Sequence, residues 1–205
     1  MTDAGRERHW NDVYRTKGDN DVSWFEEVPR LSLELIGQHA SQDAAVIDIG
    51  GGASRLPDAL LAAGYSDVTV LDISAEALAK ARERVEQAGG SAQWIVSDVT
   101  QWRPERAYDL WHDRAAFHFL TDVADQAAYR AVLDAALRSG GTAIIATFAP
   151  DGPEKCSGLP VARHDGASIA AALGSGFSLE QELRHEHHTP WGRVQKFQFS
   201  VFRKA

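Results

Sequence analysis

The 205 residues suffice for one hydrophobic core, and their 44% hydrophobic and 24% charged content excludes disordered and fibrous classes. The formal net charge of -8 argues against nucleic-acid binding, which needs clustered Lys and Arg side chains. Cys156 is the single cysteine, and neither a secretory signal nor an apolar run of membrane-spanning length is present, so we expect a cytoplasmic protein without membrane contact.

The first 40 residues predict two helices, over 5–17 and 29–40, joined by a polar loop. From residue 44 onward strands and helices alternate, which predicts a parallel sheet with right-handed crossovers. The last two strands read as an antiparallel hairpin around the turn TPWGR. We therefore expect an α/β fold in a single domain, 1–205, with N-terminal helices and a connecting loop over 1–40 and the core of the domain over 41–205. Strands are expected at 44–49, 67–73, 91–99, 108–113, 140–150, 177–188 and 194–204, and helices at 54–64, 74–90, 122–138 and 165–173.

The stretch VIDIGGGASRL places three glycines between a buried strand and a helix, for which Ser54 is a candidate N-cap. Such turns serve dinucleotide enzymes and enzymes that use S-adenosylmethionine. Arg55 stands where the dinucleotide fingerprint needs its third glycine, so a nicotinamide oxidoreductase is disfavoured. Asp48, at the strand end, supplies a carboxylate for a ligand ammonium, and this favours a ligand with a cationic head.

Two further aspartates end the next two strands. Asp72 closes VTVLD, where a carboxylate can accept both hydroxyls of a ribose, and Asp98 closes WIVSD, where it can meet an adenine amino group. Ligands of open parallel sheets bind beyond the carboxyl ends of the strands. We therefore expect the two carboxylates to face one nucleoside.

With these motifs the sequence resembles the class I S-adenosylmethionine-dependent methyltransferases from His9 to Arg203. The family's D-x-G-x-G pattern appears here, and Ser54 departs from it where many members carry a further glycine. The resemblance implies a Rossmann-like, seven-stranded, mostly parallel sheet with one antiparallel strand in the C-terminal hairpin. It also implies S-adenosylmethionine as cofactor and S-adenosylhomocysteine as product. The cofactor residues expected are Trp24, Asp48, Gly50, Gly51, Gly52, Asp72, Ile73, Asp98 and Val99.

The stretch DLWHDRAAFHFL begins as a buried strand and ends in His112, Asp113 and Arg114. The resemblance implies that this point faces the acceptor. His112 or Asp113 is then a candidate to take the acceptor proton, and Arg114 to grip a carboxylate on the acceptor. An Asp113 and Arg114 pair that only organises the loop is the alternative. Further acceptor contacts are expected from Phe148, Arg163 and His164.

Two narrower resemblances point to different acceptors. The W-x-D-R pattern of residues 111–114 is similar to thiopurine S-methyltransferases, whereas WxxxY and VSWF near the N-terminus are similar to eukaryotic lysine methyltransferases. We expect a small thiol, amine or acid as acceptor, with protein lysine second, and a non-catalytic S-adenosylmethionine-binding module stays open.

Several remaining residues have weaker interpretations. Trp24 is expected to form a lid beside the sulfonium. Cys156 and His118 are expected to be structural, and His185 with His187 has no third ligand for a metal.

Overall fold

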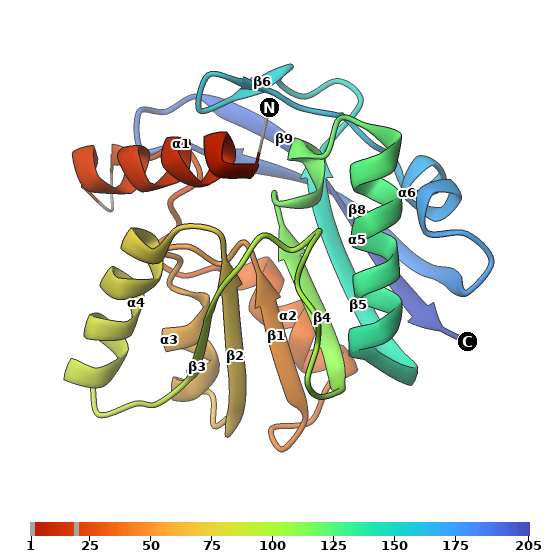
Figure 1. Ribbon diagram of the computed structural model, residues 1–205, viewed down its shortest axis with the longest axis horizontal. Helices are drawn as coiled ribbons and strands as arrows, with labels where there is room; N and C mark the ends of the chain where they lie inside the picture. Colours follow the sequence, from red (N-terminus) through yellow and green to blue (C-terminus); the bar gives the residue numbers. More distant parts are fainter. Residues whose placement is uncertain (1–2, 19–20) are drawn as a thin grey trace.

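The computed structural model describes residues 3–18 and 21–205. In this part of the chain seven strands form one sheet in the order β3, β2, β1, β4, β5, β9, β8 (Figure 1). Strand β9 runs antiparallel to both of its neighbours, whereas β1 to β5 are parallel. This confirms the predicted Rossmann-like fold with one reversed strand. The strands are β1 (Ala45–Ile49), β2 (Asp67–Asp72), β3 (Gln93–Val96), β4 (Tyr108–Arg114), β5 (Leu137–Phe148), β8 (Phe177–His188) and β9 (Val194–Lys204).

The helices fall where the sequence predicts them, with ends that differ by a few residues. They are α1 (Asp3–Thr16), α2 (Arg30–His39), α3 (Leu56–Ala62), α4 (Ala75–Gln87), α5 (Val123–Ala136) and α6 (Gly166–Leu173). The segment between β5 and α6 contains a small hairpin, β6 (Lys155–Cys156) with β7 (Leu159–Pro160). Of the expected polar loop between α1 and α2, residues 19 and 20 lie outside the described residues.

The N-cap of α3 differs from the prediction. Arg55, rather than Ser54, is the N-cap, and its side chain makes no capping hydrogen bond. The Ser54 hydroxyl still accepts a hydrogen bond from the backbone N–H of Leu56 at 3.0 Å. Ser54, the residue before the N-cap, therefore satisfies one of the unpaired N–H groups at the start of α3.

Helices cover both faces of the sheet because neighbouring residues of a strand point to opposite sides. Ile47 and Trp111 pack with α5 and α6, whereas Val46 and Leu110 pack with α2 and α3. Figure 1 shows α5 in front of the sheet and α2 behind it. By the same alternation, Asp113 projects toward α5 while its two chain neighbours project toward the α2 side, and this decides their roles in the site.

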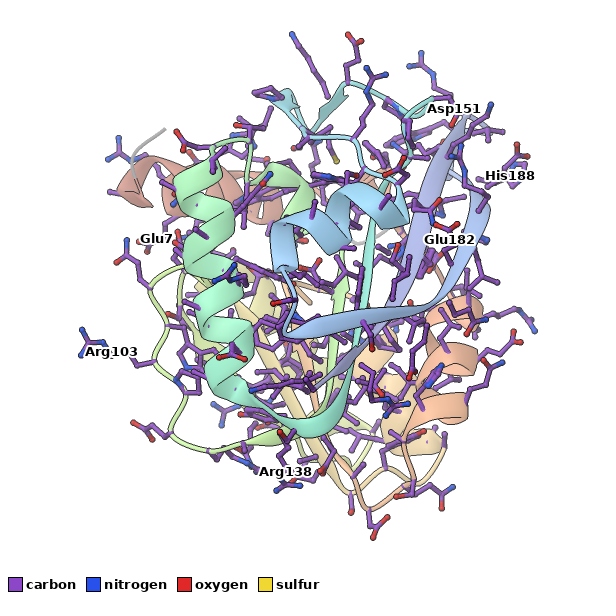
Figure 2. All side chains as sticks on the ribbon, turned by 90° about the vertical axis from the view of Figure 1, so that its right-hand side faces the viewer. Glu7, Arg103, Arg138, Asp151, Glu182 and His188 are labelled. Carbon is purple, nitrogen blue, oxygen red and sulfur yellow. The ribbon has the colours of Figure 1, made fainter. Side chains whose placement is uncertain are left out.

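The two edge strands of the sheet are β3 and β8, and the charged side chains of β8 protect its edge from pairing with another chain. Glu182 and His188 lie on this outer surface in Figure 2. Among the helices of residues 3–18 and 21–205, none is long and apolar enough to cross a membrane.

Helix α1 lies across the carboxyl ends of β2 and β3, above them in Figure 1. It is held to α4 by Asn11, whose side-chain oxygen accepts a hydrogen bond from the Ser74 hydroxyl at 2.8 Å. The Lys80 ammonium donates to the carbonyl oxygens of Tyr14 and Lys17 at the end of α1. Because these contacts fix both ends of the α1 and α4 interface, α1 forms a roof over the ligand edge of the sheet.

Candidate active site

The carboxyl ends of β1 to β4 open into a cavity beneath α1. It holds about 880 Å³ of empty space, a volume that includes its open mouth. Six of the nine predicted cofactor residues line it: Trp24, Gly50, Asp72, Ile73, Asp98 and Val99. Its other walls come from Arg6, Trp10 and Tyr14 of α1, from Ile49, Leu71, Ser97, Arg114, Ala115, Ala116, Phe119 and Leu120, and from Phe148, Cys156, Gln195 and Phe197.

The glycine turn fits tightly between α1 and the segment after β4. Gly52 has φ +51°, and a Cβ there would lie 2.5 Å from the Tyr14 hydroxyl oxygen. Gly50 has φ +64°, and a Cβ there would lie 2.7 Å from the Cβ of Ala116. Both positions therefore require glycine for backbone conformation and for space. Gly50 lines the cavity, whereas Gly52 lies against Tyr14 of α1.

Asp72 presents a buried carboxylate to the cavity. Its side chain is 6% exposed, and one oxygen accepts a hydrogen bond from the N–H of Ser74 at 2.7 Å. Among the described residues no cation forms an ion pair with it. Burial raises the pKa of Asp72 to about 7. A buried carboxylate that lacks a cation is stabilised by neutral hydrogen-bond donors, and the two hydroxyls of a ribose supply them.

Asp98 has a different environment, because its oxygens already have partners. One oxygen accepts hydrogen bonds from the N–H and the hydroxyl of Thr100, at 2.9 and 2.7 Å. The other lies 3.0 Å from the guanidinium of Arg6, which also pairs with Asp125 at 2.8 Å. Asp98 thus ties α1 to the sheet as well as lining the cavity. The apolar side chains of Leu71, Ile73, Val99 and Leu120 complete a slot suited to a flat base.

A second cavity, of about 650 Å³, lies on the other side of Tyr14 and Trp24, which line both cavities. Asp48 and Gly51, two further predicted cofactor residues, line this one. Asp48 accepts a hydrogen bond from Nδ1 of His112 at 2.7 Å. The ammonium contact expected of Asp48 therefore belongs to a compartment next to the one that holds Asp72.

The structure corrects the expected role of His112. Its side chain is only 1% exposed, and both ring nitrogens are engaged, Nδ1 with Asp48 and Nε2 with the Ser32 hydroxyl of α2 at 2.9 Å. A ring held on both sides has no free lone pair for an acceptor proton. His112 instead orients the carboxylate of Asp48.

The expected role of Asp113 is corrected as well. Its side chain is fully buried and lines neither cavity. It accepts hydrogen bonds from the Tyr129 hydroxyl at 2.7 Å and from the N–H groups of Ala116 and Phe117 at 2.8 and 3.1 Å. Burial raises the pKa of Asp113 to about 6. Asp113 therefore stabilises the turn after β4. Its partners are the Tyr129 hydroxyl and two backbone N–H groups, and not Arg114, with which the alternative interpretation paired it.

Arg114 does reach the site and lines both cavities. Its Nη1 donates to the carbonyl oxygen of Trp24 at 3.1 Å, and its Nη2 lies 3.3 Å from a carboxylate oxygen of Glu26. The guanidinium stacks on the ring of Phe197 at 5.1 Å, and burial lowers the pKa of Arg114. The next residue, Ala115, has φ +74°, a conformation that non-glycine residues adopt rarely and that concentrates at functional sites.

The segment around Trp24 is held from three strands. His187 of β8 binds the carbonyl oxygen of Ser23 through Nε2 at 2.7 Å and approaches Glu26 through Nδ1 at 3.3 Å. Gln195 of β9 donates to the Ser23 hydroxyl at 3.3 Å, and Arg114 of β4 holds the carbonyl of Trp24. Trp24 itself meets Trp10 edge to face at 5.8 Å. The structure thus shows Trp24 as a wall of the cavity, and its mobility as a lid stays a prediction.

The histidine cluster near residue 185 supplies one of the contacts that hold the segment around Trp24. His187 is buried between Ser23 and Glu26. In the part of the chain that the structure describes, no group of three or more His, Cys, Asp or Glu side chains is arranged to hold a metal ion.

Of the three expected acceptor contacts, Phe148 lines the cavity, but Arg163 and His164 do not. Arg163 pairs with Glu154 at 3.3 Å, near the surface. His164 is buried against the ring of Phe117 and donates its backbone N–H to the carbonyl of Phe148. Neither Arg163 nor His164 lines the cavity, which corrects the expectation for both residues.

Sequence reasoning missed the walls that come from distant segments. Trp10 and Tyr14 form an aromatic stripe of α1 that looks the same as a core stripe. Gln195 and Phe197 are contributed by the C-terminal hairpin. Cys156 lines the cavity too, and burial raises the pKa of its thiol to about 12, so it stays protonated. His118 is buried and does not line the cavity, and burial lowers its pKa to about 3, as expected of a structural histidine.

Comparison with known proteins agrees with this geometry. Residues 46–141 match the family model of a methyltransferase domain. Comparison with curated proteins gave no significant match.

Among solved structures, the chain is similar to magnesium protoporphyrin IX methyltransferase of Synechocystis with bound S-adenosylmethionine, at 18% identity over 100% of this chain and 98% of that chain, with a TM-score of 0.73. It is similar to 1,6-didemethyltoxoflavin-N1-methyltransferase of Burkholderia thailandensis, at 18% identity over 99% and 87%, with a TM-score of 0.72. A structure from work on the conversion of a disulfide bond into a thioacetal group in echinomycin biosynthesis gives 20% identity over 97% and 92%, with a TM-score of 0.77. Residues 46–141 thus match a methyltransferase domain, and the chain as a whole shares the fold of these solved methyltransferases.

Proposed function

We propose that this chain transfers the methyl group of S-adenosylmethionine to a small-molecule acceptor that binds in the larger cavity. The observation that carries the proposal is the shared cavity. Asp72 and Asp98 line it beside an apolar slot, and Arg114, Phe148 and Phe197 line it as well. A nucleoside and an acceptor can therefore lie in one enclosed space.

The residues present fit the cofactor. Asp72 supplies the carboxylate for the ribose, because it is buried and has no cation beside it among the described residues. Ile73 and Val99 enclose the adenine, and Asp48, with Gly51 beside it, serves the ammonium group. When bound, S-adenosylmethionine supplies an electrophilic methyl group on a positively charged sulfur.

The chain itself aligns and shields the reacting atoms. Methyl transfer is an in-line displacement, so the enzyme must chiefly hold the acceptor close to the methyl carbon. Trp10, Tyr14 and Trp24 form the outer wall that excludes water. Helix α1 and Trp24 are thus part of the catalytic unit, which supports one domain for the N-terminal helices and the core.

A small acceptor is favoured over a lysine side chain by the charges in the cavity. Apart from the cofactor carboxylates and the ion-paired Arg6, the charged side chain that lines it is Arg114, which repels an ammonium group. The two similar methyltransferases above are named for acting on a porphyrin and a didemethyltoxoflavin, both small molecules. Protein lysine remains the second candidate, because VSWF and WxxxY are similar to lysine methyltransferases.

Transfer of labelled methyl from S-adenosylmethionine into a cell extract tests the proposal, with the extract split into acid-precipitable and soluble fractions. The control is Asp72→Asn, which keeps the shape of the side chain and removes its charge. We expect label in the soluble fraction that is much reduced with the variant. Label in the precipitate would favour a protein acceptor, and binding of the cofactor without any transfer would favour a non-catalytic binding module.

A further inference from the structure

The part of the cavity away from the nucleoside slot has its own chemistry. We call it the acceptor half and define it by Trp24, Arg114, Phe148, Cys156, Gln195 and Phe197. These side chains are neighbours of one another. Phe148 and Phe197 meet edge to face with ring centroids 4.9 Å apart, and the guanidinium of Arg114 lies over the Phe197 ring at 5.1 Å.

Three of the six side chains that define the acceptor half are aromatic. Trp24 faces it from the roof, and Phe148 and Phe197 face it from β5 and β9. Aromatic rings at such spacing favour edge or face contact with another flat ring. The shape therefore suits a flat aromatic or heteroaromatic molecule better than an aliphatic chain.

No side chain of the acceptor half, as the described residues define it, can remove a proton from the acceptor at neutral pH. Cys156 holds its own proton because burial raises the pKa of its thiol to about 12. Gln195 does not titrate, and Arg114 is a cation. The two groups expected to act as a base, His112 and Asp113, are engaged elsewhere and do not line this cavity.

Arg114 is the charge that the acceptor meets. Its guanidinium makes one hydrogen bond, to the carbonyl of Trp24, and one looser ion pair with Glu26 at 3.3 Å. Nε is buried without a hydrogen-bond partner, and the buried Nη2 has the ion pair with Glu26 but no hydrogen bond. These adjacent nitrogens form the fork that matches a carboxylate or another anion, so a small shift of the side chain would satisfy both.

Glu26 is not an alternative base. Burial alone would raise the pKa of Glu26, but the hydrogen bond with His187 and the charge of Arg114 outweigh burial and lower it. Glu26 also lines the second cavity rather than the acceptor half. Its effect on the acceptor is therefore to offset part of the positive charge of Arg114.

From these observations, and resting on the proposed function, we propose that the acceptor is a flat aromatic molecule that reacts as an anion, with Arg114 as the residue that selects its charge. Arg114 draws the ionised form of the acceptor into the cavity, so the chain needs no general base. The acceptor's lone pair forms the new bond to the methyl carbon as the carbon–sulfur bond breaks. The electron pair of that bond stays on sulfur, which becomes a neutral thioether. Anion and sulfonium give two neutral products, and no proton is released.

A binding experiment tests the charge selection without turnover. Protein saturated with S-adenosylhomocysteine is titrated, by calorimetry at neutral pH, with 2-naphthoate, with the neutral 2-naphthamide of the same shape, and with the saturated decalin-2-carboxylate. We expect 2-naphthoate to bind at least about tenfold more tightly than the amide, as a charge-assisted hydrogen bond implies. We also expect it to bind more tightly than the saturated acid. Equal affinities, or tighter binding of the amide, would overturn the proposal.

Two variants should change the preference for naphthoate over naphthamide in opposite directions. Arg114→Gln keeps an N–H donor for the Trp24 carbonyl but loses the charge, so the preference for naphthoate over naphthamide should vanish. Glu26→Gln removes the neutralising carboxylate while the contacts of His187 and Arg114 with the backbone remain, so the preference should increase. If Arg114 only held the Trp24 segment, both variants would weaken both ligands alike. That result would contradict the proposal. If Arg114→Gln does not fold, the result with Glu26→Gln alone tests the proposal.

Turnover separates this proposal from the proposed function. With aromatic thiols and phenols of graded acidity as acceptors, the pH of half-maximal kcat/KM should move with the acidity of each acceptor. A midpoint that stays fixed across the series would reveal a base on the enzyme and refute the proposal, while leaving methyl transfer intact. Failure to bind S-adenosylhomocysteine at all would instead refute the proposed function.

Discussion

The pH dependence of nucleoside binding follows from Asp72. In the ligand-free protein burial raises the pKa of Asp72 to about 7, whereas hydroxyl donors of a bound ribose favour the charged carboxylate and lower it. Binding therefore requires loss of a proton at acidic pH. With a pKa of about 7, roughly one tenth of the side chains are ionised at about pH 6 and nine tenths at about pH 8. The affinity should be about tenfold higher at the higher pH.

The assay is calorimetric titration with 5′-methylthioadenosine, which keeps the ribose and the adenine but lacks the titratable amino acid part. Asp72→Asn is the control, because it should bind more weakly and lose the dependence between these pH values. This control also separates Asp72 from Asp113, whose pKa is raised to about 6. An affinity that is unchanged between about pH 6 and 8, or that falls as the pH rises, would refute the assignment of the carboxylate to the ribose.

The same pKa shift has a consequence for the stability of the ligand-free protein. Because the folded-state pKa of Asp72 is raised, its contribution to the free energy of unfolding is present below the unfolded pKa of about 4. It is lost as the pH rises through about 7. Asp72→Asn should therefore flatten the stability profile across this range, as measured by urea denaturation at several pH values.

Four other substitutions test the structure. Gly52→Ala should lower the free energy of unfolding by more than the ~1–2 kcal/mol that a positive φ costs, since its Cβ would also meet the roof hydroxyl at 2.5 Å. Gly89→Ala, with φ +77° and open space around it, should show the φ cost alone in the same denaturation assay. Tyr129→Phe removes the hydroxyl that donates to the buried Asp113 and should destabilise the fold by ~1–3 kcal/mol without changing the affinity for S-adenosylhomocysteine. Arg6→Gln cuts two ion pairs that fix α1 over the slot and should speed dissociation of S-adenosylhomocysteine in stopped-flow fluorescence by up to about tenfold, and an unchanged rate would show that the roof does not depend on them.

The sheet and its helices were predictable because each element carries a local signal. The run TAIIATF of β5 is apolar on both faces, as a strand covered by helices on both sides must be. Ser74, Asp122 and Asp165 cap α4, α5 and α6 with side-chain hydrogen bonds, so the starts of these helices can be predicted from the sequence. The aspartates at the ends of β2 and β3 could be assigned to one cavity for the same reason, since parallel strands bring their carboxyl ends together.

The roles of His112 and Asp113 could not be predicted, because burial at a strand end depends on which helices pack there. The alternation of the strand shows that the two side chains point to opposite faces. It does not show that Ser32 of α2 is the hydrogen-bond partner on one face and Tyr129 of α5 the partner on the other. Likewise, the sequence does not distinguish whether the stripe of Trp10 and Tyr14 covers a cavity or the core, because an apolar helix stripe has the same spacing in both cases.

The most direct test of the account is a crystal structure of the chain with S-adenosylhomocysteine and 2-naphthoate. The account predicts density for the nucleoside in the larger cavity, with the ribose hydroxyls on Asp72, the adenine between Ile73 and Val99, and the naphthoate carboxylate on Arg114. A nucleoside bound elsewhere would contradict the assignment of the cavity. A correctly bound nucleoside with the naphthoate carboxylate turned away from Arg114 would contradict the proposed selection of an anionic acceptor.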